Sequence, residues 1–373
     1  MTATVFSIMV VDDDKMFTNS IRRTLNRLKP EWHFTLLTSP LEAQQRLEQG
    51  ESPHVLLTDL LMPRLNGAEL LAHAHIHSPL TLRALLTGFN DEKVLTHNKG
   101  VVHFLLAKPF TDDDILHLLD STESLANLPL TLETRTKLGR LRDLPILPAI
   151  YNKLCTLLKS PDAGLEDMAR LIEQDAYLSG RFLQIANSPF LGFSRSTLSV
   201  LEAANRLGAR LICSMVLALQ SHQQLQSLIS PAVHKSIADA AFMQANLSRK
   251  MAAYANMGQK AADQVYMASL LGSLGRLMTS TESNQALLAD ATPESFATDA
   301  IVTAYLLTLW GFDSSLCQLI LEQSAGDTTA LKSDSAALVA CAGFVSKGES
   351  PPKDLLARSV NETSIASLLQ HAS

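Results

Sequence analysis

The sequence predicts an α/β domain followed by an all-α domain, and two patterns indicate this division. From residue 5 to about residue 120, short β-branched or leucine-rich runs alternate with segments of helical periodicity, an order typical of a parallel sheet covered by helices on both faces. After residue 121 no strand pattern remains, and apolar residues recur at the spacing of helices. We therefore expect a doubly wound, five-stranded parallel sheet with an all-α domain behind it.

Five strands, each followed by a helix, make up the predicted first domain. The strands are expected at Ser7–Val11, His33–Leu37, His54–Thr58, Thr81–Leu86 and Val101–Leu106. The helices are expected at residues 15–28, 40–49, 67–77, 91–98 and 112–120. Sheets of this kind place their working residues at the carboxyl ends of the strands, so a site is expected there.

The second half of the chain is predicted to be entirely helical. The clearest helices are expected at Glu166–Gln174, Leu178–Ala186, Val200–Leu207, Leu211–Gln220, Val233–Tyr254, Ala262–Met278, Ala297–Trp310 and Ala336–Val345. The predicted organisation is a first domain over residues 1–121, a polar linker over 122–135, a helical domain over 136–345 and a C-terminal helical extension over 346–373.

Composition excludes several classes of protein. The net charge is −6 and no block of like charges is present, so neither direct DNA binding nor a membrane surface is indicated. No segment offers 18 uninterrupted apolar residues, and the N-terminus lacks a basic region before its apolar run. The four cysteines are scattered singly without CxxC spacing, which is typical of buried thiols in a reducing compartment. These features predict a cytoplasmic protein.

Carboxylates gather at the predicted strand ends. Asp12 and Asp13 directly follow the first strand, and Asp59 ends the third, HVLLTD. An acidic run can simply cap a helix, as we expect for Thr111 and the three aspartates that follow it. Around Asp12 the third carboxylate changes the interpretation, because three crowded carboxylates repel one another and a bound divalent cation relieves that repulsion. Few protein oxygens with several waters suit Mg²⁺.

Two further strand ends complete the constellation. Thr87 ends ALLT, and Lys108 ends FLLAK. A carboxylate flanked by a hydroxyl, an ammonium and a magnesium ion is equipped to receive a phosphoryl group, because each neighbour neutralises charge on the transferred oxygens. Asp59 is the predicted nucleophile.

The motifs VVDDD, DLLMPRLNG, LLTG and LLAKPF resemble the receiver domain of bacterial response regulators, over about residues 5 to 120. The resemblance implies that Asp59 accepts phosphate from a sensor histidine kinase, a phosphotransfer protein or a small phosphodonor. It implies that Thr87 is a switch hydroxyl, that Lys108 pairs with the phosphate and that the Lys108–Pro109 bond is cis. The implied Mg²⁺ ligands are the side chains of Asp12, Asp13 and Asp59 and the backbone carbonyl of Leu61.

One position departs from the receiver pattern. The family usually has an aromatic residue three positions before the lysine, where this chain has Leu105, and Phe104 lies one step earlier. One step along a strand reverses the face. Either a bulge restores Phe104 to that face, or the relay from the threonine to the aromatic ring is weakened while phosphorylation stays intact.

The helical half resembles the HDOD domain, a relative of the HD-type metal phosphohydrolases, over roughly residues 136 to 345. The matching stretches are LRDLPILPAI, LEDMARLIEQDAYLSGRFLQIANSPF, LEAANRLGARLICSMVLAL and LLTLWGFD. Residues at the family's typical positions are Asp175, Asn187, Ser188, Leu207, Gly208, Trp310 and Gly311.

The stretch YMASLLGSLGRLM, residues 266–278, is where HD hydrolases carry adjacent His and Asp ligands for their metal ions. This chain has Gly272 and Ser273 at the matching positions. Glycine has no ligand atom and a neutral serine is a poor replacement for a carboxylate, so we expect no catalytic residue in this domain. The glycines are expected to let neighbouring helices approach closely.

The sequence therefore favours a signalling adaptor: a receiver phosphorylated on Asp59, joined to a non-catalytic module that contacts a downstream signalling protein. Dimerisation through the fourth and fifth receiver helices is implied by resemblance alone. The main alternative is a metal-dependent phosphohydrolase or cyclic-dinucleotide phosphodiesterase with unrecognised ligands, drawn from His222, His234, Asp263 and Asp299. A non-catalytic nucleotide sensor is a third possibility, because such pockets need no fixed motif.

Overall fold

The computed structural model describes residues 5–88, 101–145, 147–187, 195–288, 296–324, 331, 333–347, 349–352 and 355. The chain forms two compact units. The first unit comprises Met1–Ile146, Ser283–Pro293 and Tyr305–Phe312, and the second comprises Leu147–Glu282, Glu294–Ala304 and Asp313–Ser373. The first unit thus includes short segments from late in the chain, and it runs past residue 121, where the sequence placed the end of the first domain.

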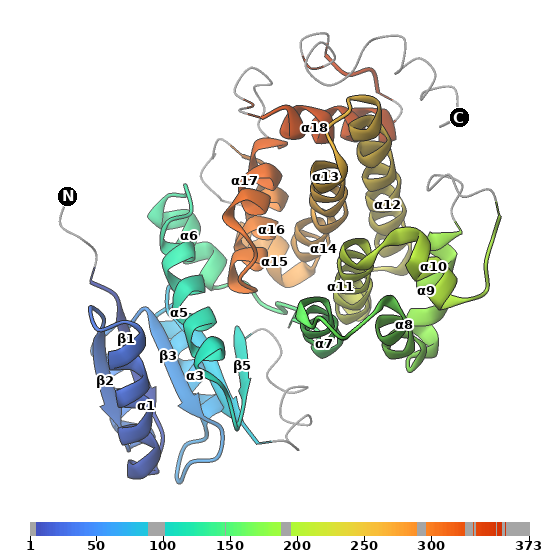
Figure 1. The fold of residues 1–373 in the computed structure, drawn as a ribbon. Coiled ribbons are helices and arrows are strands. Elements are labelled where there is room, and N and C mark those ends of the chain that lie inside the picture. The colour runs from blue at the N-terminus through green and yellow to red at the C-terminus, as the bar shows by residue number, and fades with distance from the viewer. Residues whose placement is uncertain are drawn as a thin grey trace. The chain divides into compact units, whose positions relative to one another are not determined.

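The first unit contains the predicted parallel sheet, with strand order β2-β1-β3-β4-β5 (Figure 1). The strands are β1 (Ser7–Val11), β2 (His33–Leu37), β3 (Val55–Asp59), β4 (Leu82–Thr87) and β5 (Phe104–Ala107). Every neighbouring pair is parallel. Four of the five β1 residues are buried, as expected for a strand covered on both faces.

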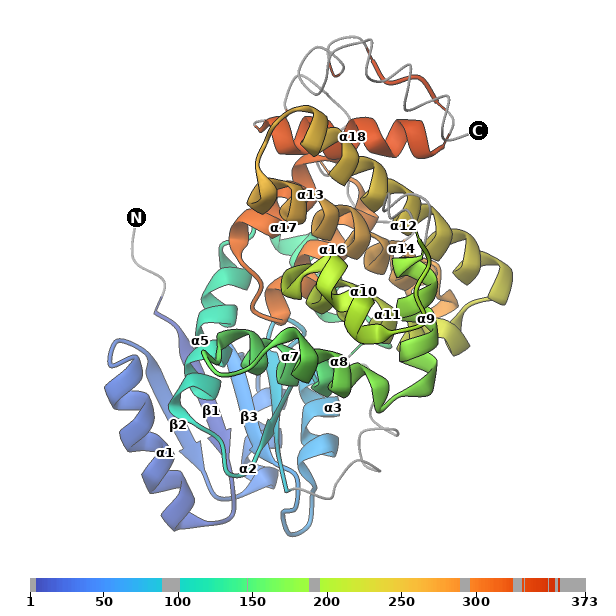
Figure 2. The ribbon, with the colours of Figure 1, turned by 45° about the vertical axis from the view of Figure 1, so that its right-hand side comes forward.

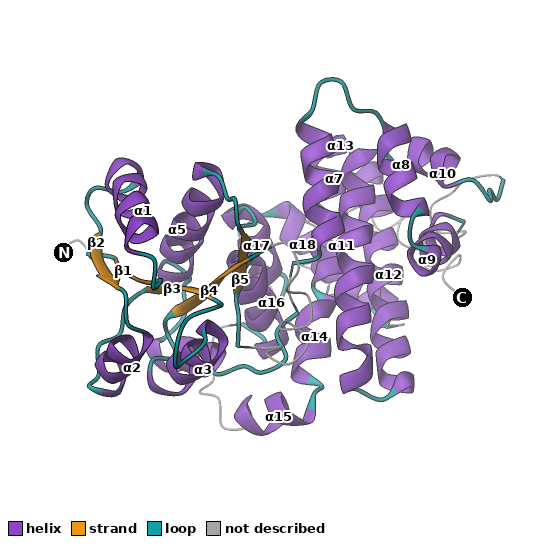
Figure 3. Ribbon diagram, turned by 90° about the horizontal axis from the view of Figure 1, so that it is seen from below, coloured by secondary structure: helices purple, strands orange, loops and turns teal. Residues whose placement is uncertain are grey.

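Helices cover both faces of this sheet. They are α1 (Lys15–Leu28), α2 (Pro40–Glu48), α3 (Gly67–His77) and α5 (Asp112–Ala126). Figure 3 shows α1 and α5 on one face and α2 and α3 on the other. The Thr111 side chain accepts from Asp114 N and closes a capping box at α5, which confirms the capping interpretation of that acidic run. The helix expected at residues 91–98 lies outside the described residues.

Several boundaries differ from the prediction, and the start of β5 and the end of α5 are among the largest differences. Strand β5 begins at Phe104, because the Val101 carbonyl accepts from Arg83 Nε at 2.5 Å instead of joining the ladder. The predicted polar linker, residues 122–135, holds the end of α5 and the start of α6 (Leu132–Gly139). Leu128 and Leu130 of this segment are buried, whereas Leu132 is exposed. Arg83 Nη2 donates to the Gly139 carbonyl at 3.3 Å. This ties α6 to the sheet.

The second unit is helical throughout its described part, as predicted. Its helices include α7 (Ala149–Lys159), α8 (Leu165–Glu173), α9 (Ala176–Ala186), α10 (Val200–Leu207), α11 (Ala209–Leu225), α12 (Pro231–Tyr254), α13 (Gln259–Leu271), α14 (Ser273–Thr279), α17 (Ser314–Glu322) and α18 (Asp334–Ser346). Helices α12 and α13 pack side by side (Figure 2). Two more helices, α15 (Glu282–Leu288) and α16 (Thr298–Leu309), are shared between the units.

The expected helix Ala262–Met278 is interrupted, and this prediction was wrong in that detail. Helix α13 ends at Leu271 and α14 begins at Ser273. The Gly275 N–H donates to Thr303 Oγ1 at 3.0 Å, and the same hydroxyl lies 3.3 Å from the Gly272 carbonyl. A side chain inserted into the helical ladder breaks or kinks a helix.

Close approach of helices at Gly275 is confirmed. A Cβ at this residue would lie 1.8 Å from the Asp299 carbonyl oxygen, so only glycine fits between α14 and α16.

Two sequence expectations concern compartment and membrane. The four cysteines are free thiols, three of them buried. Among the described helices, none combines the length and apolar character needed to cross a bilayer.

Candidate functional site

The sheet brings the predicted site residues to one edge. Asp59 is the last residue of β3 and pairs with Leu86, which precedes Thr87 on β4. Thr87 in turn pairs with Ala107, so Lys108 emerges beside it. Strand order 2-1-3-4-5 reverses direction between β1 and β3, and ligands in such sheets bind outside the carboxyl ends of the strands at this point. Asp12 and Asp59 follow or end those two strands.

Lys108 joins the two carboxylates. Its Nζ lies 2.6 Å from Asp59 Oδ1 and 3.0 Å from Asp12 Oδ2. Burial alone would lower the pKa of Lys108, but the hydrogen bonds and charges of Asp59 and Asp12 raise it above its usual value. The lysine is therefore a charged ammonium held on the predicted nucleophile. The Lys108–Pro109 bond that follows is cis, as the resemblance implied.

The three N-terminal aspartates have different roles. Asp12 is 2% exposed; burial raises its pKa, against the opposing effects of the Asp14 N–H and of Lys108. Asp14 caps α1 by accepting from Met16 N at 2.7 Å, so the capping interpretation holds for this residue. Asp13 is exposed. The run therefore supplies one buried carboxylate, one exposed carboxylate and one helix cap.

The loop after β3 fixes the orientation of Asp59. The Leu61 N–H donates to Asp59 Oδ2 at 2.9 Å, leaving Oδ1 for Lys108. Gly67 begins α3 so close to the strand that a Cβ would lie 2.0 Å from the Asp59 carbonyl oxygen. Asn66 and Glu69 form a capping box around it. Local turn chemistry therefore positions the predicted nucleophile.

Two of the three predicted magnesium carboxylates lie together. Asp12 and Asp59 share one ammonium, whereas Asp13 is exposed. No three His, Cys, Asp or Glu side chains in the described residues form a group suited to a metal ion. Mg²⁺ commonly uses only one or two carboxylates and keeps several waters. A buried carboxylate beside a second one, both oxygen donors that need positive charge, fits such an ion.

The departure at Leu105 persists in the structure. Strands β4 and β5 pair in unbroken register from Phe104 to Ala107, so no bulge changes the faces. Leu105 pairs with Leu85, two residues before Thr87, and therefore shares the Thr87 face. Phe104 is on the opposite face, with its ring edge-on to His117 of α5 at 5.6 Å between centroids. An aliphatic side chain stands where receivers usually have an aromatic ring.

In the second unit, the predicted degenerate positions lie at the break between α13 and α14. Ser273 is fully buried, and its hydroxyl donates to the Leu270 carbonyl at 2.7 Å. With its single proton used, this hydroxyl accepts from His222 Nε2, 2.8 Å away. Burial lowers the pKa of His222 to about 3, with His234, Arg181 and Arg276 adding to the effect. His222 is therefore a neutral, hydrogen-bonded core residue.

The alternative metal ligands do not assemble. His234 Nε2 donates to the His222 carbonyl at 3.1 Å, so these two histidines are neighbours. Asp263 accepts from Gln259 at 2.7 Å on the same helix, and Asp299 faces Arg276, with Oδ2 3.9 Å from Nε. Throughout the described ranges, no three candidate ligand side chains converge.

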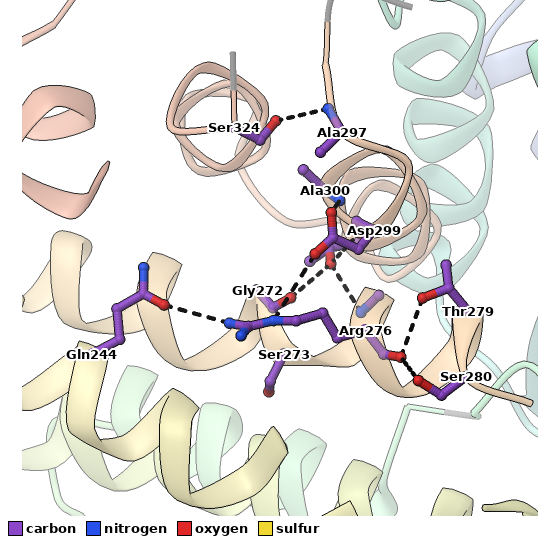
Figure 4. A network of polar contacts seen from close by, with 12 residues as sticks. Gln244, Gly272, Ser273, Arg276, Thr279, Ser280, Ala297, Asp299, Ala300 and Ser324 are labelled. Carbon is purple, nitrogen blue, oxygen red and sulfur yellow. Dashed lines mark hydrogen bonds and ion pairs between the residues drawn. The ribbon is translucent and has the colours of Figure 1, made fainter. Parts of the chain in front are cut away.

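Sequence reasoning missed Arg276. It belongs to the same face as Ser269 and Gly272, seven and four residues earlier, and all three line a cavity in the second unit. Figure 4 shows its guanidinium between Gln244 and Asp299. The available signal was its isolation: it is the single charged residue in YMASLLGSLGRLM.

Several HDOD positions have structural roles. Asp175 caps α9 through Leu178 N at 3.0 Å, and Gly208 has a φ of 82° between α10 and α11. The Asn187 side chain exchanges two hydrogen bonds of 2.8 Å with the Thr197 backbone. Ser188 lies outside the described residues. These residues shape turns and helix ends.

Comparison with protein-family models gives two matches. Residues 8–120 match the response regulator receiver domain, and residues 144–325 match the HDOD domain. The two ranges leave a short segment between them, which contains α6.

Individual proteins are similar to parts of this chain. A chemotaxis protein CheY homolog of Campylobacter jejuni is 31% identical over 109 residues, which make up 28% of this chain and 82% of that protein. An uncharacterized protein of Treponema pallidum is 27% identical over 138 residues, 34% of this chain and 27% of that protein. The crystal structure of an HDOD domain protein of unknown function from Geobacter sulfurreducens is 20% identical, covers 64% of this chain and 93% of that chain, and has a TM-score of 0.49. The chain spans less than half the length of several curated relatives that it matches.

Proposed function

The chain belongs to the two-component response regulators, with a receiver domain followed by an HDOD domain, and from this premise we propose that phosphorylation of Asp59 controls the contacts of its HDOD domain. The observation that supports the proposal most directly is the Asp59–Lys108 pair of 2.6 Å at the carboxyl edge of the sheet. The phosphodonor is a sensor histidine kinase, a phosphotransfer protein or a small acyl phosphate.

The residues present suit phosphoryl transfer. Asp59 Oδ1 or Oδ2 attacks the phosphorus, the bond from phosphorus to the donor atom breaks, and an acyl phosphate forms on Asp59. The Lys108 ammonium already lies on this carboxylate and can follow the charge onto the phosphoryl oxygens. Thr87, beside Lys108 on the next strand, offers a hydroxyl. Asp12, Asp13, Asp59 and the Leu61 carbonyl would hold Mg²⁺, which would supply further neutralisation of the phosphoryl charge.

We further propose that the HDOD domain is a non-catalytic output module. Support comes from Gly272 and Ser273 at the positions of the HD ligands, and from His222, which is neutral and committed to the buried Ser273 hydroxyl. The partner is a downstream signalling protein or, through receiver contacts, a second copy of this chain. The receiver family and the free thiols support a cytoplasmic location.

Phosphorylation is tested with acetyl phosphate and Mg²⁺ on the full chain. We expect a mass gain of one phosphoryl group per chain, lost in Asp59→Asn and lost without Mg²⁺. Asp113→Asn is the matched control, because Asp113 is an exposed acid in the first turn of α5. Labelling that survives Asp59→Asn would place the acceptor elsewhere and overturn the assignment.

The output is tested with beryllofluoride, a stable phosphoryl analogue, by hydrogen exchange and light scattering. We expect altered exchange in helices of the second unit or a change of oligomeric state, absent in Asp59→Asn. A chain that carries beryllofluoride and shows neither change would refute control of the HDOD domain by phosphorylation.

The phosphohydrolase alternative has its own test. Purified protein is assayed for transition metals and for hydrolysis of cyclic dinucleotides and phosphorylated guanosine nucleotides. We expect neither retained metal nor turnover. Turnover that depends on metal and is abolished by His222→Gln would make the HDOD domain an enzyme.

A further inference from the structure

The second unit contains a cavity of about 360 Å³, within the size range of small-molecule sites, roughly 300–1,000 Å³. Its walls come from α12, α13, α14, α16, α17 and α18. Gly272 lies on this wall, whereas Ser273, one residue later, faces His222 on the other side of the helix. The cavity is therefore separate from the buried histidine pair.

The charged groups at the cavity are two cations and one anion. Arg276 and Lys347 are the cations, and Asp299 is the carboxylate. The described residues offer the Arg276 guanidinium two polar contacts, both long: Gln244 Oε1 at 3.4 Å from Nη2 and Asp299 Oδ2 at 3.9 Å from Nε. A guanidinium has five N–H donors in a planar fork that matches phosphate. Arg276 lines the cavity, and these two long contacts leave most of its donors for a ligand.

The remaining lining suits a flat, uncharged group. Small residues, Ala297, Ala300, Ala340 and Gly343, form much of the wall, next to the ring of Phe344. Gln323 also lines the cavity, and a side-chain amide can both donate to and accept from the edge of a heterocycle. A cationic end and a smooth wall with amides are complementary to a phosphate joined to a planar base.

We propose that this cavity binds a nucleoside monophosphate, or a phosphorylated metabolite of that size, with its phosphate on Arg276. This goes beyond the proposed phosphorylation, because it gives the HDOD domain a ligand of its own. Lys347 adds positive charge at the same cavity, and Asp299 competes with the phosphate for Arg276. The ligand needs no metal and undergoes no reaction.

The proposal is tested by calorimetric titration of the full chain with AMP, GMP, adenosine, inorganic phosphate and cyclic di-GMP at one ionic strength. We expect one saturable site for a nucleoside monophosphate, with adenosine and inorganic phosphate each bound at least tenfold more weakly. Cyclic di-GMP, with two bases, should not compete. Absence of saturable binding of either monophosphate at millimolar concentration would overturn the proposal.

Variants separate the phosphate contact from general effects. Arg276→Gln should weaken binding at least tenfold, and Asp299→Asn should tighten it several-fold by removing the competing carboxylate. Arg170→Gln, on an exposed arginine of α8, should leave affinity unchanged. Ala340→Leu fills the cavity without altering charge and should abolish binding, which keeps the test valid if Arg276→Gln fails to fold.

Binding of the nucleoside monophosphate is expected not to depend on Asp59. Asp59→Asn should bind the monophosphate as wild type does, so failure of phosphorylation and failure of ligand binding are distinguishable. Weaker binding in Asp299→Asn, or unchanged binding in a folded Arg276→Gln, would contradict the assigned phosphate position.

Discussion

Lys108 shows how much one side chain determines at the acceptor site. Its ammonium forms ion pairs with both Asp12, which is buried, and Asp59. A buried carboxylate deprived of its partner is costly, because desolvation disfavours the charged form. We therefore expect the lysine to stabilise the site, in addition to its proposed role in phosphoryl transfer.

Lys108→Met is expected to destabilise the chain by about 1–3 kcal/mol at pH 7 by leaving Asp12 without its ammonium. The loss should shrink as pH falls toward 5, because the pKa of Asp12, already raised by burial, rises further in the variant and the carboxyl becomes neutral by protonation. Urea unfolding at pH 7 and pH 5 measures this. A penalty that stays constant with pH would show that Asp12 does not depend on the lysine.

His222 makes the second unit sensitive to acid. The pKa of this histidine is about 3 in the folded chain, against 6.5 in the unfolded chain. Between these two pH values His222 is therefore protonated in the unfolded state and neutral in the folded state. The contribution of neutral His222 to the free energy of unfolding is complete above pH 6.5. It is lost as pH falls toward 3, at about 1.4 kcal/mol per pH unit.

His222→Gln keeps a donor for Ser273 and removes the titration, so unfolding free energy should fall less steeply between pH 6.5 and 4.5 than in wild type. His75 has a pKa of about 4, so it continues to contribute to the pH dependence of the unfolding free energy in this variant. Ser273→Ala is the matched control: it should lower stability by about 1–3 kcal/mol at every pH, because it leaves a buried N–H unpaired. An unchanged slope in His222→Gln would contradict the buried, neutral state.

At the scale of elements, the periodicity of the sequence predicted the strands and most helices, because burial on both faces or on one stripe leaves a pattern in the chain itself. Where a side chain from elsewhere in the sequence ends a helix or a strand, the sequence of that element shows no such pattern. Thr303 breaks the helix at Gly272 from a distance of some 30 residues in sequence, and Arg83 removes Val101 from β5 through a side chain.

The same distinction applies to the sites. Asp12, Asp59, Thr87 and Lys108 could be predicted because strand ends of a parallel sheet meet at one edge. The Arg276 cavity could not, because its walls come from six helices whose packing no local motif encodes. The face of Phe104 was left open by the sequence, and the unbroken register of β5 decides it.

Gly67→Ala tests how the start of α3 positions the nucleophile. The added methyl meets the Asp59 carbonyl oxygen at 2.0 Å, so the loop must move. We expect a loss of about 1–3 kcal/mol and slower labelling by acetyl phosphate. Gly180→Ala is the control, because Gly180 lies in the exposed interior of α9 with open space around it; it should gain up to about 1 kcal/mol and label normally. Equal labelling of Gly67→Ala and wild type would contradict this role of the loop.

At the scale of the whole molecule, the first unit is not continuous in sequence. Its segments from late in the chain make specific contacts: the Tyr305 ring lies edge-on to His103 at 6.4 Å between centroids, and the Asn284 side chain bonds both backbone groups of Arg142. Residues 1–146 therefore lack part of their packing when the rest of the chain is removed.

A fragment ending at residue 146 is expected to keep its sheet, but the amide hydrogens of the strands should be protected from exchange to different degrees. Amide hydrogens of Arg83 and His103 should exchange faster than in the full chain, because Tyr305 no longer covers this end of β4 and β5. Amides of β1, such as Met9, are the internal control and should change little. Equal acceleration at all strands would point to global destabilisation instead, and no acceleration would show that the late segments add nothing.

The interleaved chain also sets an order for biosynthesis. A ribosome delivers the proposed acceptor Asp59, the proposed magnesium ligands and Lys108 within the first third of translation. The segments that complete the first unit, ending at Phe312, emerge only near the end. Maturation of the first unit is thereby coupled to synthesis of the helical half. Nascent chains that stall before Phe312 would hold every residue needed to receive phosphate while the scaffold around them is still incomplete.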